Sequence, residues 1–249
     1  MQILRYDGTF DGFLGVLERL YALNDDVLKK GVDVVNERVF PEKKNLLFGE
    51  KIAADPKTAW QFYKYLRSIA PRVIFEKLYL YYLCDTACLE IPLALVLKRS
   101  RTYPELWKNI TDCDVLRLHK AERGLHREKH RWLGLLRFVD LGQGVLLARF
   151  EPTYNVLPLI RTHFVKRFPN ETFFIVDTLR NLLFAHQRGR EELLWVNNLR
   201  ITTPVGSDPL VSLWKTYFAE VAIPERCNVV RQRRKLPLRF RQFLPEFWR

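Results

Sequence analysis

Three histidines and an arginine are spaced along residues 113–131 so that one face of a helix would carry all four. At 100° per residue, His119, Arg123, His126 and His130 fall within about 60° of one another. Arginine holds anionic oxygens through charge-assisted hydrogen bonds, and imidazole donates to them whether it is neutral or protonated. This face therefore predicts binding of a phosphate-rich polymer, and the structural alternative is a helix face that contacts only water.

Metal binding is the competing chemistry for this segment. His126 and His130 have the spacing of two zinc ligands on a helix, but the string H-R-E-K-H lacks the glutamate that follows the first histidine in metalloproteases. Glu128 would lie on the opposite side of the helix from His126, and the arginines would repel a divalent cation. Cys84 and Cys88 form a C-x3-C pair without the third cysteine of a radical iron–sulfur motif, so we interpret them as structural. We predict no metal and no cofactor.

A second basic block lies near the C-terminus. Residues 226–249 contain a single glutamate, several hydrophobic residues and a run of cations that includes Arg231, Arg233 and Arg234. Separate cationic contacts with one polyanion add up, because each of them releases counterions. Two basic blocks favour nucleic-acid binding more strongly than one does, and we expect Trp132 to offer a ring on which a base can stack.

Several polar residues lie among hydrophobic ones in the second half of the chain. Glu151, His163 and Asp177 could line a pocket in which a carboxylate acts as general base and the histidine as its acid or electrostatic partner. That chemistry suits a hydrolase that acts on damaged DNA. The same residues, together with Arg149 and Arg180, could instead form buried ion pairs, and the sequence leaves both interpretations open.

The overall charge points to a polyanionic partner. The chain has 249 residues, and its 41 Lys and Arg against 28 Asp and Glu leave a formal charge of +13 and a pI near 9.7. The longest apolar run, residues 91–97, is far shorter than the roughly 20 residues that a membrane helix needs, and we find no signal peptide. We expect a cytoplasmic protein without a membrane partner.

Hydrophobic periodicity predicts the elements of the N-terminal half. A short strand reaches a turn at Asp7-Gly8, and an apolar stripe then indicates a helix over residues 10–21. Asp55-Pro56 has the residue types of a helix N-cap and first position, and it would begin a helical region that continues to about residue 102. Within that region we expect Trp60, Tyr63 and Leu66 to face the core.

The second half of the chain alternates between strand and helix patterns. A hairpin is predicted within residues 132–152, a helix over residues 155–168, and three short strands within residues 172–197. A helix capped by Asp208 would follow and pack into the core. The predicted fold is α+β, a mostly antiparallel sheet packed with helices plus a helical segment in the N-terminal half. We predict a single domain, residues 1–249, with a helical insertion at about 55–131.

Several strings resemble a bacterial family of DNA metabolism or DNA repair proteins. They are YDGTFDGFL, H-x3-H-R followed by GLLRF, ARFEPTYNVLPLI with HFVKRF, and DPLVSLWKTYF with ERCNVVRQRRKLPLRF, and they span nearly the whole chain. Members are usually encoded beside a radical S-adenosylmethionine (radical SAM) protein, and some are fused to a uracil-DNA glycosylase-like domain. The resemblance implies a nucleic-acid context and a protein partner. One departure is Phe240-Arg241, where the family pattern leads us to expect a tryptophan.

These observations predict a basic accessory factor in DNA repair or DNA metabolism that holds single-stranded or damaged DNA for a radical SAM partner enzyme. The alternatives are a glycosylase- or nuclease-like hydrolase, and a scaffold that binds the partner without contacting DNA. The residues expected to contact DNA are Arg123, His126, His130, Arg131, Arg137, Arg167, Arg231, Arg234 and Arg239.

Overall fold

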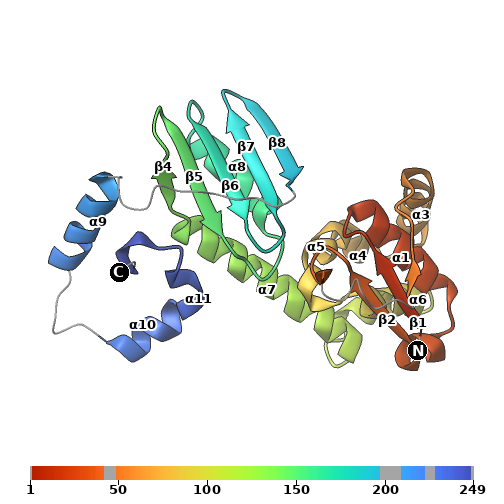
Figure 1. Cartoon of the computed structure of the whole chain (residues 1–249). Coiled ribbons are helices and arrows are strands. Elements are labelled where there is room, and N and C mark those ends of the chain that lie inside the picture. Colours follow the sequence, from red (N-terminus) through yellow and green to blue (C-terminus); the bar gives the residue numbers. More distant parts are fainter. Residues whose placement is uncertain (1, 42–48, 197–208, 222–227, 248–249) are drawn as a thin grey trace. The chain divides into compact units, whose positions relative to one another are not determined.

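The protein has an α+β fold that divides into two compact units (Figure 1). The computed structural model describes residues 2–41, 49–196, 209–221 and 228–247. Unit 1 consists of Met1–Arg127 with Thr153–Asn155, and unit 2 consists of Glu128–Pro152 with Val156–Arg249. The boundary falls inside one long helix, α7 (Cys113–Leu135). The α+β class is as predicted, and the single domain with an insertion at 55–131 stays a prediction.

Unit 1 contains a small parallel sheet. Strand β1 (Gln2–Tyr6) lies in the middle, and β2 (Val32–Asn36) and β3 (Glu50–Lys51) pair with it on either side. Parallel neighbours need a crossover connection, and α1 (Phe10–Ala22) and α2 (Asp25–Lys30) provide the one between β1 and β2. The sequence predicted β1 and α1 but not this parallel pairing, because β2 and β3 are too short to show a clear alternation.

The turn predicted at Asp7-Gly8 is confirmed, and it sets the start of α1. The Asp7 carboxylate accepts hydrogen bonds from the Thr9 backbone N–H (3.0 Å) and hydroxyl (2.7 Å), and the Thr9 hydroxyl accepts from the Gly12 N–H as the N-cap (3.0 Å). Gly8 has φ +75°, and a Cβ there would lie 2.5 Å from Asn36 Oδ1. Only glycine therefore fits this turn.

Helices make up the rest of unit 1, as predicted. Asp55 caps α3 (Pro56–Ile69), and the apolar stretch after it divides into α4 (Arg72–Glu76) and α5 (Leu78–Leu83). Helix α6 (Glu90–Ser100) follows, and α1 packs against both α3 and α6. Among the described residues, no helix combines the length and the hydrophobicity needed to cross a lipid bilayer.

The predicted core face of α3 is only partly correct. Leu66 is fully buried, but the Trp60 side chain is 56% exposed and Tyr63 is half-buried. The expectation that both rings face the core was wrong, because Ala59 and Phe62 occupy the inward positions of the helix. The two rings lie on the neighbouring face, at the edge of the buried stripe.

Unit 2 is built on a five-stranded sheet in the order β4-β5-β6-β7-β8. All neighbours pair antiparallel except β5 and β6, which are parallel and are connected through α8 (Leu157–Arg167). The mostly antiparallel sheet, the hairpin and the three later strands were all predicted. The strands are β4 (Phe138–Asp140), β5 (Val145–Phe150), β6 (Thr172–Asp177), β7 (Leu182–Gln187) and β8 (Arg190–Trp195).

The C-terminal residues add short helices to unit 2. Phe240 and Leu244 are completely buried, so this segment is anchored to the unit although its sequence is strongly basic. The helices are α9 (Pro209–Glu220), α10 (Val229–Lys235), α11 (Leu238–Arg241) and the 3-10 helix η5 (Pro245–Phe247). The composition of this segment is both hydrophobic and basic. It agrees with a tail that is anchored by its hydrophobic residues and exposes its charged ones.

Helix α9 forms where the sequence predicted it, but the described side chains of its apolar stripe are not in the core. The Leu213, Tyr217 and Val221 side chains are 68%, 57% and 56% exposed, which contradicts the expected packing. The helix is attached through Trp214, whose indole N–H donates to Glu246 (3.0 Å). The predicted Asp208 cap lies outside the described residues.

Candidate nucleic-acid interface

Helix α7 presents the exposed cationic face that the histidine spacing predicted, with one departure. Arg123, His126 and His130 are exposed, and the first two lie on the part of α7 that belongs to unit 1. His119 is half-buried instead, since its ring lies 4.1 Å from the Trp107 ring and its Nε2 lies 3.3 Å from the Trp107 carbonyl oxygen. His119 therefore stabilises the packing of α7 and is not part of the exposed face.

Trp132 cannot stack on a base in this structure, and that prediction was wrong. The side chain is 1% exposed, and its ring packs against Phe150 (5.1 Å), Phe240 (4.8 Å) and Phe243 (5.8 Å). The reason is that the C-terminal segment folds back over α7 and covers the indole. The sequence could not show this, because Phe240 and Phe243 are more than a hundred residues away along the chain.

The two basic blocks meet at the ring of Phe240. The Arg131 guanidinium from α7 lies 5.8 Å from the ring centroid, and the Arg239 guanidinium from α11 lies 4.8 Å from it. Arg239 also forms an ion pair with Glu128 (3.2 Å), whose side chain is 4% exposed. Cations that are distant in sequence thus converge on one hydrophobic anchor in unit 2.

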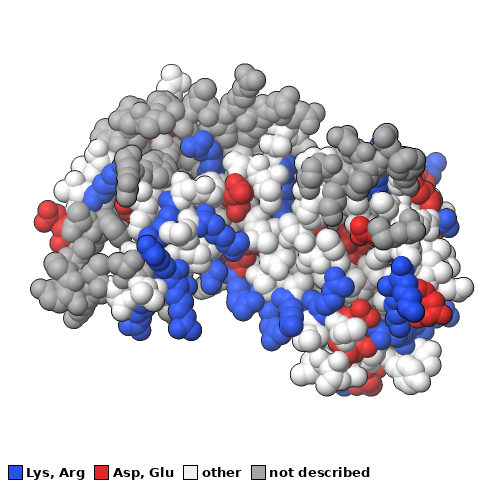
Figure 2. Space-filling model, turned by 60° about the horizontal axis from the view of Figure 1, so that its bottom comes forward, with Lys and Arg blue, Asp and Glu red and all other residues white. Residues whose placement is uncertain are grey.

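Helix α10 adds further positive charge to this region. Arg231, Arg233 and Arg234 are exposed and have no ion-pair partner among the described residues. Arg241 donates to Gln232 (3.3 Å) and so connects α11 to α10. Figure 2 shows many Lys and Arg side chains on the viewed face, with fewer Asp and Glu side chains among them. We call the following set the α7–tail surface: Arg131, Arg231, Arg233, Arg234, Arg239 and Arg241.

The positive charge of the chain is concentrated in unit 2. This unit has 20 Lys and Arg against 11 Asp and Glu, a net charge of +9, whereas unit 1 has 21 against 17, a net charge of +4. An uneven distribution of this kind produces a positive potential on one part of a protein and attracts polyanions to it.

Arg137 and Arg167 have partners of different kinds. Arg137 forms an ion pair with Glu246 (3.6 Å), and its guanidinium lies 5.8 Å from the centre of the Trp214 ring. Its charge is partly neutralised, and it helps to hold α9. Arg167 is exposed on α8 and lies 5.6 Å from the centre of the Phe168 ring, so it remains available to an anion.

The three residues predicted to be catalytic in a hydrolase, Glu151, His163 and Asp177, differ from one another in burial. Asp177 is completely buried, and its carboxylate pairs with Arg180 (3.0 Å) while it accepts two backbone N–H groups. Arg180 also donates to the Pro152 carbonyl (3.0 Å). The alternative of a buried ion pair is confirmed for Asp177, and a carboxylate held this way is a poor general base. Glu151 and His163 are exposed, and their catalytic role stays a prediction.

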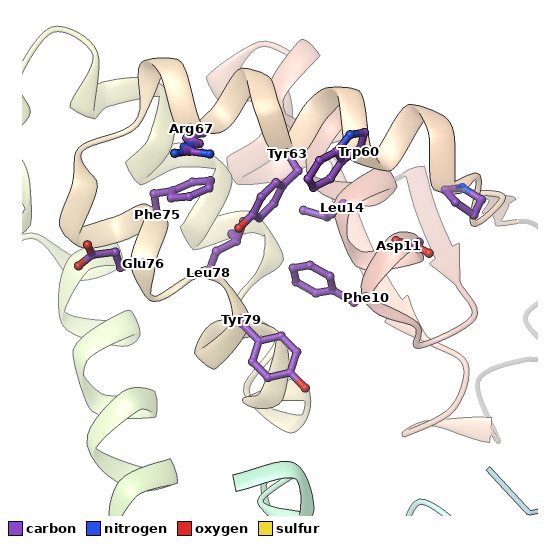
Figure 3. Close-up of a pocket in the computed structure, with 11 residues that line it drawn as sticks. Phe10, Asp11, Leu14, Trp60, Tyr63, Arg67, Phe75, Glu76, Leu78 and Tyr79 are labelled. Atoms are coloured by element: carbon purple, nitrogen blue, oxygen red, sulfur yellow. The ribbon is translucent and has the colours of Figure 1, made fainter. Parts of the chain in front are cut away.

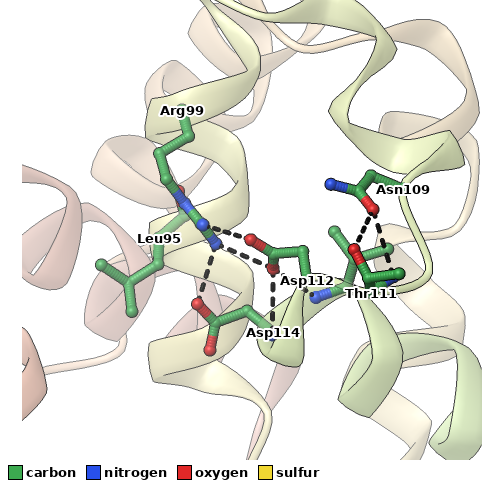
Figure 4. A network of polar contacts seen from close by, with 7 residues as sticks. Leu95, Arg99, Asn109, Thr111, Asp112 and Asp114 are labelled. Carbon is green, nitrogen blue, oxygen red and sulfur yellow. Dashed lines mark hydrogen bonds and ion pairs between the residues drawn. The ribbon is translucent and has the colours of Figure 1, made fainter.

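A cluster of possible metal ligands lies at the start of α7. Among the described residues, Asp112, Cys113 and Asp114 are close enough to share an ion. Arg99 already occupies both carboxylates, at 2.5 Å from Asp112 and 2.8 Å from Asp114 (Figure 4). Asp112 also caps α7 by accepting from the Asp114 and Val115 N–H groups (3.0 and 3.1 Å). The cluster is therefore explained by helix capping and ion pairing.

The acidity of Asp112 reflects these contacts. Burial alone would raise the pKa of its carboxyl group, but the hydrogen bonds from Arg99 and from the backbone outweigh burial, and the pKa lies below its ordinary value. Burial raises the pKa of the neighbouring Asp114 more than Arg99 lowers it. Asp112 is thus the carboxylate on which this ion pair mainly depends.

The cysteine pair is divided between core and surface. Cys84 is buried, and burial raises the pKa of its thiol well above the ordinary value, so it stays protonated at neutral pH. Its burial agrees with the structural interpretation, and the interpretation stays a prediction. Cys88 is exposed and adopts a left-handed backbone conformation with φ +50°.

A buried polar group in unit 1 was not expected from the sequence. The Tyr6 hydroxyl donates to the Glu90 carboxyl (2.8 Å) and accepts from the Asn36 side-chain amide (3.1 Å). Burial raises the pKa of both Glu90 and Tyr6. These residues link β1, β2 and α6, and no local pattern could identify them because they are far apart in sequence.

Comparison with known proteins places the chain in a family. Residues 89–246 match the model named Domain of unknown function (DUF4130), which is more than half of the chain, so the protein belongs to that family. Comparisons with curated proteins and with solved structures returned no match.

Proposed function

We propose that this member of the DUF4130 family is a cytoplasmic DNA-binding accessory factor that holds single-stranded or damaged DNA on the α7–tail surface. The observation that carries the proposal is the convergence of Arg131 and Arg239 at the Phe240 ring, beside the exposed arginines of α10. Like charges held near one another repel, and a bound phosphate backbone relieves that repulsion and releases counterions.

The residues of this surface favour binding of the sugar-phosphate backbone over sequence-specific contacts with bases. Guanidinium groups suit phosphate because they form two parallel hydrogen bonds with it. The α7–tail surface offers guanidinium groups, whereas Trp132, the ring expected to stack with a base, is buried beneath it. We therefore expect this surface to bind sugar-phosphate with little sequence preference.

The resemblance to DNA repair proteins supplies the biological context of the proposal. It implies a radical SAM enzyme, encoded nearby, as the protein that acts on the DNA held by this factor. The charge of unit 2, +9, supports the DNA contact, and the buried ion pair of Asp177 disfavours the hydrolase alternative.

The test is binding of a labelled single-stranded oligonucleotide, of about 20 nucleotides, measured by fluorescence anisotropy at low salt. The variant Arg131→Gln with Arg234→Gln removes one cation from each basic block and keeps the Arg239–Glu128 ion pair intact. We expect its affinity to fall at least about tenfold, since hydrogen bonds to charged groups are strong.

The matched control is Arg188→Gln with Arg190→Gln, which removes the same charge from the exposed turn after β7 and from the first residue of β8. It should bind almost as the wild type does. Equal losses in both double variants would mean that only net charge matters, and they would overturn the proposed surface. Cleavage of the oligonucleotide that Glu151→Gln abolishes would favour the hydrolase.

A further inference from the structure

The outward face of α3 combines aromatic rings with cations. Trp60, Tyr63, Lys64 and Arg67 occupy positions i, i+3, i+4 and i+7, which place them on one side of the helix. Interleaving of flat rings and positive charge is typical of surfaces that bind single-stranded nucleic acid. This face lies in unit 1, and none of its residues belongs to the α7–tail surface.

This face of α3 lines a cavity in unit 1. The cavity has a volume of about 820 Å³ and lies between α3, the start of α1, and the helices α4 and α5 (Figure 3). A cavity of this size can hold an organic ligand such as a nucleotide. Besides Trp60, Tyr63 and Arg67, its lining includes Phe10, Asp11, Leu14, Phe75, Leu78 and Tyr79.

The rings that line the cavity form flat walls. Trp60 and Tyr63 are nearly parallel, with an angle of 10° and a centroid distance of 5.6 Å, and Phe75 lies 4.9 Å from Tyr63. On the facing side, Phe10 and Tyr79 are 5.6 Å apart and inclined at 74°. Tyr79 is 43% exposed and Trp60 56% exposed, and both rings contribute to the lining of the cavity.

The charges of the cavity are placed at its two ends. Figure 3 shows Arg67 and Asp11 on opposite sides of the hollow, with Trp60, Tyr63 and Phe10 between them. Neither Arg67 nor Asp11 has an ion-pair partner among the described residues, whereas the Glu76 carboxylate is held by Arg72 at 2.6 Å. The cavity therefore offers a cation, a set of flat rings and a carboxylate in that order.

The Trp60 ring is poorly placed to bind a cationic ligand, although the cavity lining also includes the carboxylates of Asp11 and Glu76. Aromatic rings can bind quaternary ammonium groups, but the Lys64 ammonium already lies over the Trp60 ring, 5.2 Å from its centroid, and Arg67 is part of the lining. Both cations would repel a positively charged ligand. They would attract a ligand that carries a phosphate together with a flat ring.

We propose that this cavity binds a nucleobase and its phosphate. The base stacks on Trp60 and Tyr63, the phosphate accepts hydrogen bonds from Arg67, and an exocyclic amino group of the base donates to the Asp11 carboxylate. The base can come from a single strand or from a free nucleotide. The assignment does not depend on the proposed function, because every residue involved lies in unit 1.

The experiment measures binding of dAMP to the full-length protein by calorimetry, with deoxyribose 5-phosphate and choline as comparison ligands. The wild type should bind dAMP and neither of the other two. Trp60→Leu should weaken dAMP binding about tenfold or more, in line with the loss of one base stack, and Trp60→Phe should retain most of it. Arg67→Gln should weaken dAMP binding, and Arg67→Lys should restore part of it.

Tyr103→Leu is the matched control, because Tyr103 is a 67% exposed ring of unit 1 that does not line the cavity. It should leave dAMP binding unchanged, and thermal unfolding should show that Trp60→Leu folds as stably as this control. Asp11→Asn should reduce the preference for dAMP over dTMP, which lacks an amino group.

The source of the base is decided by comparing dAMP with a short single-stranded oligonucleotide and its abasic counterpart. If the intact oligonucleotide binds more tightly than dAMP, and this tighter binding is lost with the abasic oligonucleotide and in the Trp60→Leu variant, the base comes from a single strand. If the oligonucleotide and dAMP bind with equal affinity, the ligand is a free nucleotide. The proposal is overturned if dAMP does not bind, if Trp60→Leu binds it like the wild type, or if choline binds instead. The double variant Arg131→Gln, Arg234→Gln should bind dAMP as the wild type does. The result for this cavity is therefore independent of whether the α7–tail surface binds DNA.

Discussion

The positive side chains of the two units differ in the partners that they contact. In unit 1, cations meet carboxylates: Lys77 lies 2.7 Å from Glu122, Lys98 lies 2.9 Å from Asp25, and Arg99 is held by two aspartates. In unit 2, Arg239 also pairs with a carboxylate, that of Glu128, but the guanidinium groups of Arg131 and Arg241 lie over the Phe240 and Phe247 rings, and the exposed arginines of α10 have no ion-pair partner among the described residues.

This difference separates charge that stabilises the fold from charge that remains available to a ligand. A cation paired with a partly buried carboxylate is neutralised and contributes to folding, whereas a cation over a ring keeps its full charge and most of its hydrogen-bond donors. We infer that the ion-paired cations of unit 1 mainly stabilise the fold, and that Arg131 and the exposed arginines of α10 in unit 2 mainly serve binding.

The largest expected effect comes from removing the ring at which the two basic blocks meet. Phe240→Ala deletes a completely buried side chain, and such changes cost about 3–5 kcal/mol of unfolding free energy. The tail should detach from Trp132, and trypsin should then cleave quickly after Arg239 and Arg241. Urea unfolding and limited proteolysis measure the two effects.

The control for this substitution is Leu238→Ala, two residues earlier in the same helix, where the side chain is 65% exposed. It should change the unfolding free energy by no more than about 0.5 kcal/mol. If the two variants were equally stable and equally resistant to trypsin, the tail would not be anchored by Phe240.

A smaller effect is expected in unit 1, at the ion pair of Arg99. Asp112→Ala removes both the cap of α7 and a partner of Arg99, and we expect a decrease of about 1–3 kcal/mol in unfolding free energy at pH 7. Asp112→Asn keeps a capping oxygen but removes the charge, so its unfolding free energy should decrease less.

The pH dependence tests the same ion pair. The folded state lowers the pKa of Asp112, so its contribution is present above the ordinary aspartate pKa and disappears as the pH falls through the folded value. The stability difference between wild type and Asp112→Asn should therefore shrink in acid. A difference that is constant from pH 7 to pH 3 would contradict the ion-pair account.

The sequence predicted most of the local structure, because its signals are local. Asp55-Pro56 marks the start of α3, the Asp7-Gly8 turn precedes α1, and the alternation after residue 131 gives the hairpin and strands of unit 2. The features that the sequence did not predict depend on residues that are far apart along the chain. The burial of Trp132 requires Phe240, and the parallel sheet of unit 1 requires a strand of two residues.

The candidate sites show the same limit. Exposed arginines on α7 and α10 were predicted from composition and helical spacing, but their meeting at Phe240 was not. The cavity in unit 1 was missed because Trp60 and Tyr63 were expected in the core. The i, i+3, i+4, i+7 spacing of Trp60, Tyr63, Lys64 and Arg67 was the signal that could have identified that face.

The salt dependence of single-stranded DNA affinity tests the central claim most directly, namely that the arginines of unit 2 hold a phosphate backbone. Affinities of the wild type and of the triple variant Arg231→Gln, Arg233→Gln, Arg234→Gln would be measured between about 50 and 200 mM salt. We predict a steep fall for the wild type and a slope shallower by about two units in the variant, because each arginine that neutralises a phosphate of a single strand adds about 0.7 to the slope. A wild-type affinity that does not change with salt, or equal slopes in the two proteins, would contradict the account.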